Sequence, residues 1–142
     1  KKKRASSTDG MDHTAATSPY HPAFVAAVET DLDAAEDAIA ARAFTALGRV
    51  AERSCLRMHA DMLAADPPLV YLRPESWRVI ETVRDLQDQG LPIFFTADAG
   101  PNIKVFALPE ALPSLRASLD ALGDVLENTI ETGLGANAEI VG

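Results

Sequence analysis

One short segment combines a carboxylate with the turn residues that could hold it in place, and its centre is Asp98. The flanking segments Ile93–Phe95 and Ile103–Phe106 are rich in aromatic and β-branched residues, which favour strands. Gly100 and Pro101 predict a turn between them, and a glycine also lets backbone amides approach an anion. The pattern therefore predicts a carboxylate directed towards a ligand from the end of a strand. An Asp here also commonly caps its own turn, so the residues alone leave both roles open.

A second polar cluster, Ser6–Gly10, places hydroxyl groups beside a glycine near the start of the sequence. Hydroxyl and backbone donors of this kind bind phosphate groups. The same residues suit a helix N-terminus, because Ser7 or Thr8 precedes Met11 as a cap. Asp9 would then occupy the first helical turn. The two roles are compatible, so the sequence predicts a helix start that is able to receive a phosphate.

Cys55 and His59 stand four residues apart, on the same face of a predicted helix. This spacing allows a thiol–imidazole contact. A lone histidine in such a helix is usually a buried hydrogen-bonding residue, and a cysteine inside an apolar helix lacks the exposure that a nucleophile needs. No second His or Cys stands at a metal-ligand spacing. We therefore expect neither a cysteine nucleophile nor a zinc site.

Apolar periodicity predicts two long helices in the first half of the sequence. The first opens at Ser18–Pro19 and the second covers Phe44–Leu63. Their predicted buried residues are Phe24, Val25, Val28, Leu32, Ala35 and Ile39, then Leu47, Val50, Ala51, Ser54, Cys55 and Met58. We expect a solvated acidic face on the first helix and charge pairs at helical spacing along the second. These charged residues are Asp31, Asp33, Glu36 and Asp37, then Arg49, Glu52, Arg53 and Arg57.

The second half adds another helix, the strand pair and a further helix. A helix is predicted over Glu75–Gln89, where Gly90 ends it, and a leucine-rich helix over Leu112–Leu122. The apolar stripe of the former is Trp77, Ile80, Val83 and Leu86. A closing strand is expected at Ala138–Val141. The predicted fold is a single α+β domain over residues 1–142, with a small antiparallel sheet of three or four strands covered by helices.

Composition and charge limit the classes of function. The 142 residues suit one domain, and an apolar content of 47% is that of a folded chain. A net charge of −8 argues against nucleic-acid binding, and we interpret the basic run Lys1–Arg4 as a solvated strand end or loop. No apolar run reaches the roughly 18 residues that cross a membrane, and no signal peptide is visible. The single cysteine fits a cytoplasmic protein, and the missing initiator methionine indicates a fragment.

Several motifs follow one another in an order and at separations that resemble a known family. They are Ser6–Met11, Thr14 with Thr17–Ser18, Arg57–Ala60, Pro67–Pro68 with Tyr71–Leu72, and Asp98–Asn102. This series resembles the C-terminal half of the diphosphomevalonate decarboxylases, members of the GHMP kinase superfamily. The likeness runs from about Lys2 to the end of the chain. Its most diagnostic part is the Phe-Thr-x-Asp-Ala-Gly-Pro-Asn stretch that contains Asp98.

The resemblance implies a decarboxylation that depends on ATP and Mg²⁺ in the mevalonate route to isoprenoids. Phosphorylation of the substrate's tertiary 3-hydroxyl makes that group a good leaving group. Its loss together with the carboxylate then gives isopentenyl diphosphate, with ADP, phosphate and carbon dioxide as the other products. Asp98 matches the family's catalytic aspartate, which orients or deprotonates the 3-hydroxyl. Because a carboxylate is a weak base for an alcohol, orientation and charge stabilisation count for more than complete proton removal.

The resemblance also implies a substrate-binding role for residues near the start of the chain. Ser7 matches a serine at the phosphate-binding end of the substrate, and Met11 matches a methionine that lines the same pocket. Thr8 stands where many bacterial members have arginine and eukaryotic members have threonine. One bidentate phosphate contact is therefore missing, and both mono- and diphosphorylated mevalonates stay open as substrates.

The parts that this chain lacks are equally informative. The family's glycine- and serine-rich phosphate loop and its substrate-carboxylate arginine belong to the N-terminal half. The resemblance therefore implies that this half, or a companion chain, binds most of the ATP and Mg²⁺, and that this chain alone is inactive. It also implies a homodimer. Two alternatives stay open: a sister activity, such as a mevalonate 3-kinase or a phosphomevalonate decarboxylase, and a non-catalytic binding module of the same fold.

Overall fold

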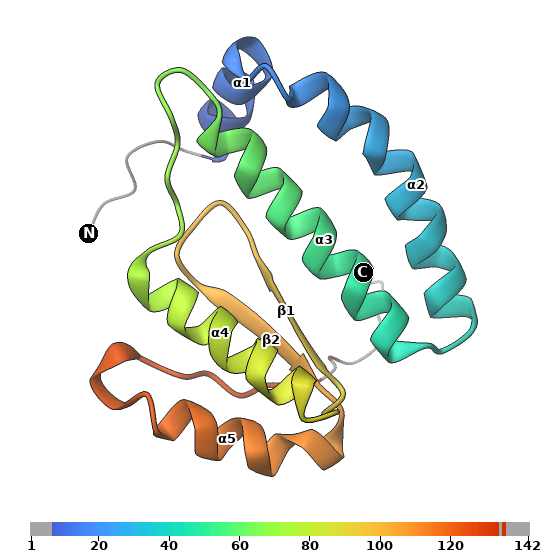
Figure 1. Ribbon diagram of the computed structural model, residues 1–142, viewed down its shortest axis with the longest axis vertical. Helices are drawn as coiled ribbons and strands as arrows, with labels where there is room; N and C mark the ends of the chain where they lie inside the picture. The colour runs from blue at the N-terminus through green and yellow to red at the C-terminus, as the bar shows by residue number, and fades with distance from the viewer. Residues whose placement is uncertain (1–6, 134, 136–142) are drawn as a thin grey trace, which may run out of the picture.

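The computed structural model describes residues 7–133 and residue 135, which form five α-helices and a two-stranded antiparallel hairpin (Figure 1). In chain order the elements are α1 (Ser7–Thr17), α2 (His21–Ala40), α3 (Phe44–Leu63), α4 (Pro74–Asp88), β1 (Ile93–Ala97), β2 (Ile103–Ala107) and α5 (Leu112–Asp120). Single 3₁₀ turns cover Pro109–Ala111 and Gly123–Val125. The predicted α+β class and the predicted helices are confirmed.

The two ends of α4 show how the local sequence sets the boundaries of a helix. Pro74 occupies its first turn, where the missing N–H costs nothing. Gly90 follows its last turn with φ +85°, a conformation that glycine adopts without strain. The first turn of the helix therefore lies at the position that Pro74 predicted, and its last turn lies at the position that Gly90 predicted.

The hairpin is regular, with Phe95 opposite Val105 and residues 98–102 joining its two strands. It was predicted from the aromatic and β-branched residues on either side of the Gly-Pro pair. The closing strand expected at Ala138–Val141 lies outside the described residues. Within the described part of the chain the sheet has two strands, fewer than the three or four expected.

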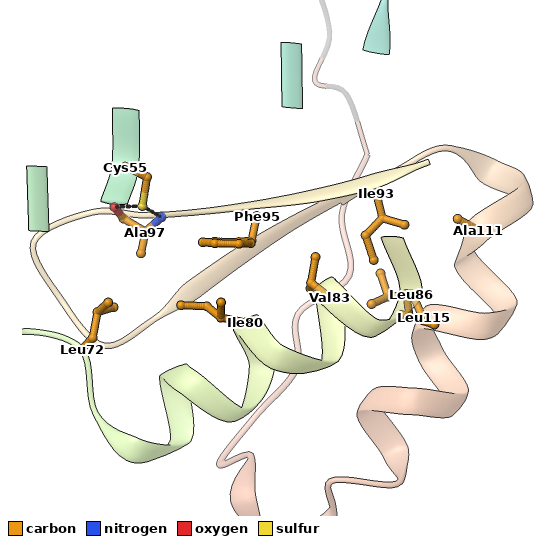
Figure 2. Close-up of a cluster of buried hydrophobic side chains, with 10 residues drawn as sticks. All are labelled: Cys55, Leu72, Ile80, Val83, Leu86, Ile93, Phe95, Ala97, Ala111 and Leu115. Carbon is orange, nitrogen blue, oxygen red and sulfur yellow. Dashed lines mark hydrogen bonds between the residues drawn. The ribbon is translucent and has the colours of Figure 1, made fainter. Parts of the chain in front are cut away.

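The hydrophobic core lies between β1, α4 and α5 (Figure 2). Its buried residues are Cys55, Leu72, Ile80, Val83, Leu86, Ile93, Phe95, Ala97, Ala111 and Leu115. Strand alternation places Ile93, Phe95 and Ala97 on one face of β1, and Phe95 at the centre is fully buried. The rigid core therefore includes the strand that ends immediately before Asp98.

The alternate residue Phe94 packs on the opposite side of β1. Its ring lies 5.0 Å from that of Phe44 on α3 and stacks 4.9 Å from that of Phe106 on β2. Gly48 of α3 lies so close that a Cβ atom there would stand 2.8 Å from Phe94. Helix α3 therefore packs closely on β1, and α2 lies outside α3 (Figure 1).

The apolar and acidic faces predicted for α2 are confirmed only in part, because Asp33, Glu36 and Asp37 are exposed as predicted but other positions are not as predicted. Three residues predicted to be buried are largely exposed: Val25 (52%), Leu32 (57%) and Ile39 (61%). Asp31 and Ala38 are buried instead. The Asp31 carboxylate binds Arg53 Nη2 at 2.6 Å and Arg57 Nη1 at 2.9 Å, both on α3. This contact turns one acidic position of α2 inwards and leaves part of its apolar surface in solvent.

The predicted charge pairs along α3 are also wrong, because the partners come from other helices. Glu52 is buried, and its carboxylate forms an ion pair with Arg84 of α4 at 3.0 Å. It also accepts a hydrogen bond from Gln87 Nε2 at 2.6 Å. Trp77, predicted in the buried stripe of α4, is 45% exposed.

Candidate active site

Asp98 directly follows β1, and its side chain is 77% exposed. The carboxylate forms an ion pair with the Lys104 ammonium on β2. The turn itself is closed by a backbone hydrogen bond, in which the Gly100 N–H donates to the Asp98 carbonyl at 2.7 Å. A backbone bond thus closes the turn, and the Asp98 carboxylate lies at the surface beside a cation.

The far side of the Asp98 loop is attached to the start of α4. Ser76 is buried, and its hydroxyl donates to the Pro101 carbonyl at 2.6 Å. The same oxygen accepts the Arg73 N–H at 3.2 Å. One side chain therefore joins the first turn of a core helix to the loop.

Cys55 of α3 holds the near side of the loop. The Ala97 N–H donates to Sγ at 3.2 Å, and the thiol donates to the Ala97 carbonyl at 3.4 Å (Figure 2). Burial raises the pKa of the Cys55 thiol, and the nearby charges of Asp98 and Glu52 add to this rise, although hydrogen bonds to Ala97 and Thr96 oppose it. A thiolate is disfavoured here, which fits the expectation of a non-nucleophilic cysteine. The hydrogen bonds of the thiol go to the Ala97 backbone.

His59 lies one turn further along α3 and is 4% exposed, as predicted for a buried histidine. Burial lowers its pKa, and a polar interaction with the Ala97 backbone and the charge of Asp98 offset this only in part. Its Nε2 atom has no hydrogen-bond partner among the described residues. A cavity of about 40 Å³ lies beside the ring, lined by His59, Leu63, Leu69, Val70, Tyr71, Leu72 and Trp77.

The predicted substrate-binding residues Ser7, Thr8 and Met11 lie in the first turns of α1. All three are exposed, Met11 by 51%. Helix α1 is described from Ser7 and has Asp9 in its first turn, as predicted, but Ser7 and Thr8 lie inside the helix rather than in the predicted cap position before it. The side chains of Ser7 and Thr8 are exposed at the surface.

Gly10 attaches α1 to the segment that lines the small cavity. A Cβ atom on Gly10 would lie 2.6 Å from Tyr71 Oη and 3.4 Å from Leu69 Cδ1. Glycine therefore permits a close approach that another residue would prevent. Because Leu69 and Tyr71 also line the cavity beside His59, packing connects α1 with the surroundings of His59.

Sequence reasoning missed two partners of the Asp98 loop. Lys104 carries a usable signal, because strand alternation places it on the exposed side of β2, close to the turn. Ser76 carries none, because its hydrogen bond to Pro101 joins residues 25 positions apart. Only the packing of α4 against the hairpin brings that pair together.

The residues that the structure describes contain no group of three or more His, Cys, Asp or Glu side chains able to hold a metal ion. None of their helices has the length and apolar character needed to cross a membrane. A larger cavity, of about 280 Å³, lies at the opposite end of β1, and its lining includes Arg49, Glu52, Arg84 and Phe94.

Comparison of the fold with known structures defines the class of protein to which the fold belongs. A structure of the Enterococcus faecalis mevalonate diphosphate decarboxylase, and one of MDDEF with MVAPP, AMPPCP and magnesium, each align with a TM-score of 0.80 and 38% identity. Each alignment covers 84% of this chain and 37% of the chain in the solved structure. The fold is therefore that of one domain of these decarboxylases.

The family model of the mevalonate 5-diphosphate decarboxylase C-terminal domain matches residues 1–136. The chain belongs to this family, and the resemblance seen in its motifs is confirmed. Diphosphomevalonate decarboxylase mvd1 of Aspergillus fumigatus is 30% identical over 141 residues, which are 97% of this chain and 32% of the relative. Phosphomevalonate decarboxylase of Haloferax volcanii is 26% identical over 135 residues, 94% of this chain and 41% of the relative. The chain thus spans less than half of each relative.

Proposed function

We propose that this chain is the C-terminal part of an ATP-dependent diphosphomevalonate decarboxylase that produces isopentenyl diphosphate. The observation that carries the proposal is the Asp98 carboxylate, 77% exposed on a loop that is held on both sides. It lies within the motif through which the sequence resembles the family. The family membership supports a carboxy-lyase reaction, and the exposed carboxylate gives that reaction a group to orient the substrate.

Asp98 orients the tertiary 3-hydroxyl of the substrate in this proposal. ATP supplies the phosphoryl group that converts the hydroxyl into a leaving group. The carboxylate accepts a hydrogen bond from the hydroxyl. It also stabilises the charge that develops on the hydroxyl group as its proton departs. The hydrogen bonds at Ala97 and Pro101 support this role, because a loop held at both ends keeps its carboxylate in one place.

We assign the phosphate end of the substrate to Ser7, Thr8 and Met11. The N-terminus of α1 offers backbone amide groups and the positive end of the helix dipole, and both attract phosphate. The hydroxyls of Ser7 and Thr8 add donors, and we expect the exposed side chain of Met11 to line the same substrate pocket. This assignment supports a substrate that carries a phosphate or a diphosphate.

ATP and Mg²⁺ bind mainly to residues outside this chain in our proposal. Asp98 offers a carboxylate oxygen, but the described residues supply no group of three ligands for a cation. Mg²⁺ takes about six oxygen ligands, so phosphates, water and other residues must complete its shell. The relative solved with AMPPCP and magnesium supports this choice of cofactors. The single cysteine supports a cytoplasmic location.

The test is an assay of the complete protein with mevalonate diphosphate and MgATP, in which ADP and carbon dioxide are both measured. We expect Asp98→Asn to lower kcat by about 10³-fold and to leave KM within about threefold, because the lost contact acts on the reacting hydroxyl. Asp120→Asn, at the exposed end of α5, is the matched control and should leave kcat unchanged. A near-normal kcat in Asp98→Asn would remove Asp98 from the mechanism.

A second candidate function is the decarboxylation of mevalonate phosphate. Thr8 leaves it open, because a threonine provides no bidentate contact to a second phosphate. The similarity to the Haloferax volcanii enzyme adds support. The values of kcat/KM for the mono- and diphosphate substrates decide between the two. ADP release without carbon dioxide would indicate a 3-kinase, and binding without turnover a non-catalytic module.

A further inference from the structure

One face of α3 carries polar side chains that replace a neighbouring strand along β1. Glu52, Cys55 and His59 are spaced by three and four residues, so they share that face. The Phe95 N–H donates to Glu52 Oε1 at 3.2 Å, and the Ala97 N–H donates to Cys55 Sγ at 3.2 Å. These donors point away from β2, because alternate amides of a strand face opposite edges. The edge of β1 is thus bound by side chains.

His59 continues this polar row to the end of the strand. From Glu52 to His59 the helix advances about 10 Å, at 1.5 Å per residue. From Phe95 to Asp98 the strand also advances about 10 Å, at 3.3 Å per residue. Because these two distances match, His59 lies level with the end of β1, where Ala97 is joined to Asp98. This agrees with the interactions of its ring with Ala97 and Asp98.

The surroundings of His59 are unusual for a residue with only a packing role. It is 4% exposed, and its buried Nε2 has no hydrogen-bond partner among the described residues. Leaving a buried polar atom unpaired is unfavourable, because the atom loses its hydrogen bonds to water and gains none. The 40 Å³ cavity on one side of the ring is large enough for an ordered water molecule. An apolar side chain would avoid this cost, so the histidine has a use beyond filling space.

We propose that His59 is a positioning residue for Asp98: its buried ring fixes the last peptide of β1 and so sets the direction in which the carboxylate leaves the sheet. The inference rests on the proposed function, because it takes Asp98 to be the group that meets the substrate. Cys55 binds both the N–H and the carbonyl of Ala97, the residue at this end of β1. The burial that lowers the pKa of His59 favours its neutral form, so it acts as a neutral ring rather than by charge.

The test compares three variants of the complete protein in the decarboxylase assay, with mevalonate diphosphate as the substrate. His59→Phe keeps the ring volume and removes both nitrogens, and we expect kcat to fall about tenfold while KM stays within about threefold. His59→Gln keeps a polar side chain in the space of the ring and should recover kcat to within about threefold of wild type. Met62→Leu, also buried on α3, is the control and should keep kcat and the melting temperature.

A double-mutant cycle separates positioning from a general structural effect. If His59 acts through Asp98, adding His59→Phe to Asp98→Asn should lower kcat by less than about twofold further. A second full loss of about tenfold would show that His59 acts elsewhere and would overturn the inference. If His59→Phe does not fold, His59→Asn takes its place in the cycle with the same expectation, because its shorter side chain withdraws from Ala97.

The outcomes also distinguish this inference from the proposed function. A near-normal kcat in Asp98→Asn overturns the role of Asp98, whatever the His59 variants do. A low kcat in Asp98→Asn together with a near-normal kcat in His59→Phe overturns only the role of His59. Equal losses in His59→Phe and His59→Gln would likewise overturn it, because the polar replacement then recovers nothing.

Discussion

Asp31 illustrates how far the role of a single side chain depends on neighbours that are distant in the sequence. Its two carboxylate oxygens accept three hydrogen bonds from Arg53 and Arg57, at 2.6–3.0 Å. The carboxylate is buried while both guanidinium groups stay more than 40% exposed. Such charge-assisted pairs are stronger than neutral hydrogen bonds, and removing one partner of a buried pair leaves an uncompensated charge.

We expect Asp31→Ala to lower the free energy of unfolding by about 2 kcal/mol, because it leaves two arginines that are still partly hydrated without their shared partner. Urea denaturation measures this change. Asp33→Ala, an exposed position on the same helix, is the control and should change stability by less than about 0.5 kcal/mol. Equal effects of the two substitutions would contradict a structural role for the Asp31 pairs.

His59 predicts a pH dependence of stability. Its pKa is lowered from 6.5 in the folded state, so the unfolded chain takes up a proton first as the pH falls. Stability should therefore decrease as the pH falls through about 6.5 and towards the lower pKa of the folded state, by at most about 1.4 kcal/mol per pH unit. The groups that face the ring are the Asp98 carboxylate and the Ala97 backbone. Denaturation curves of wild type and His59→Gln should converge at acidic pH, and parallel curves would contradict the assignment.

Helix α3 is the element on which the candidate site depends, because its two sides contact different elements. One side receives α2 through the Asp31 pairs, and the other binds the edge of β1 through Glu52 and Cys55. The ion pair between Glu52 and Arg84 extends this contact to α4. A buried carboxylate is tolerated at this position because it bonds to Arg84, Gln87 and a backbone amide.

The close contact between α3 and β1 predicts an unusual effect of a glycine substitution. In a free helix Gly48→Ala would add up to about 1 kcal/mol of stability. Here the new Cβ would lie 2.8 Å from the Cβ, Cγ and Cδ1 atoms of Phe94. The Cβ of Phe94 cannot move without its backbone, so we expect a loss of about 1–3 kcal/mol. Thermal unfolding checks this, with Gly133→Ala, where no atom lies within 4 Å, as the control. A gain in stability for Gly48→Ala would contradict the packing.

At the scale of the whole molecule, this chain holds one part of the site that we propose. Asp98 and the first residues of α1 are exposed and are the groups that we propose to bind the substrate, whereas the described residues hold no metal-binding cluster. Exposed apolar side chains such as Tyr20, Val70 and Trp77 leave surface for contact with further protein. Because the chain spans 32% of the Aspergillus fumigatus relative, the groups that bind ATP are expected to come from other residues.

We therefore expect the 142-residue chain alone to release neither ADP nor carbon dioxide from mevalonate diphosphate and MgATP, while the complete protein releases both in equal amounts. Native mass measurement of the same preparations shows whether the active species is a homodimer or contains a companion chain. Turnover by the isolated chain at a rate near that of the complete protein would contradict this prediction.

The sequence by itself determined the elements and the family. Periodicity, Pro74 and Gly90 predicted α3 and α4 closely, and the segments around Gly100–Pro101 predicted the hairpin, because these signals act between residues near in sequence. Only the tertiary structure decided which face of α2 is buried and which partners Glu52 takes. It also decided how the Asp98 loop is attached to Ser76 and Cys55. The reason is that burial of a polar group depends on donors and acceptors from other elements, and a pattern along one helix does not contain their positions.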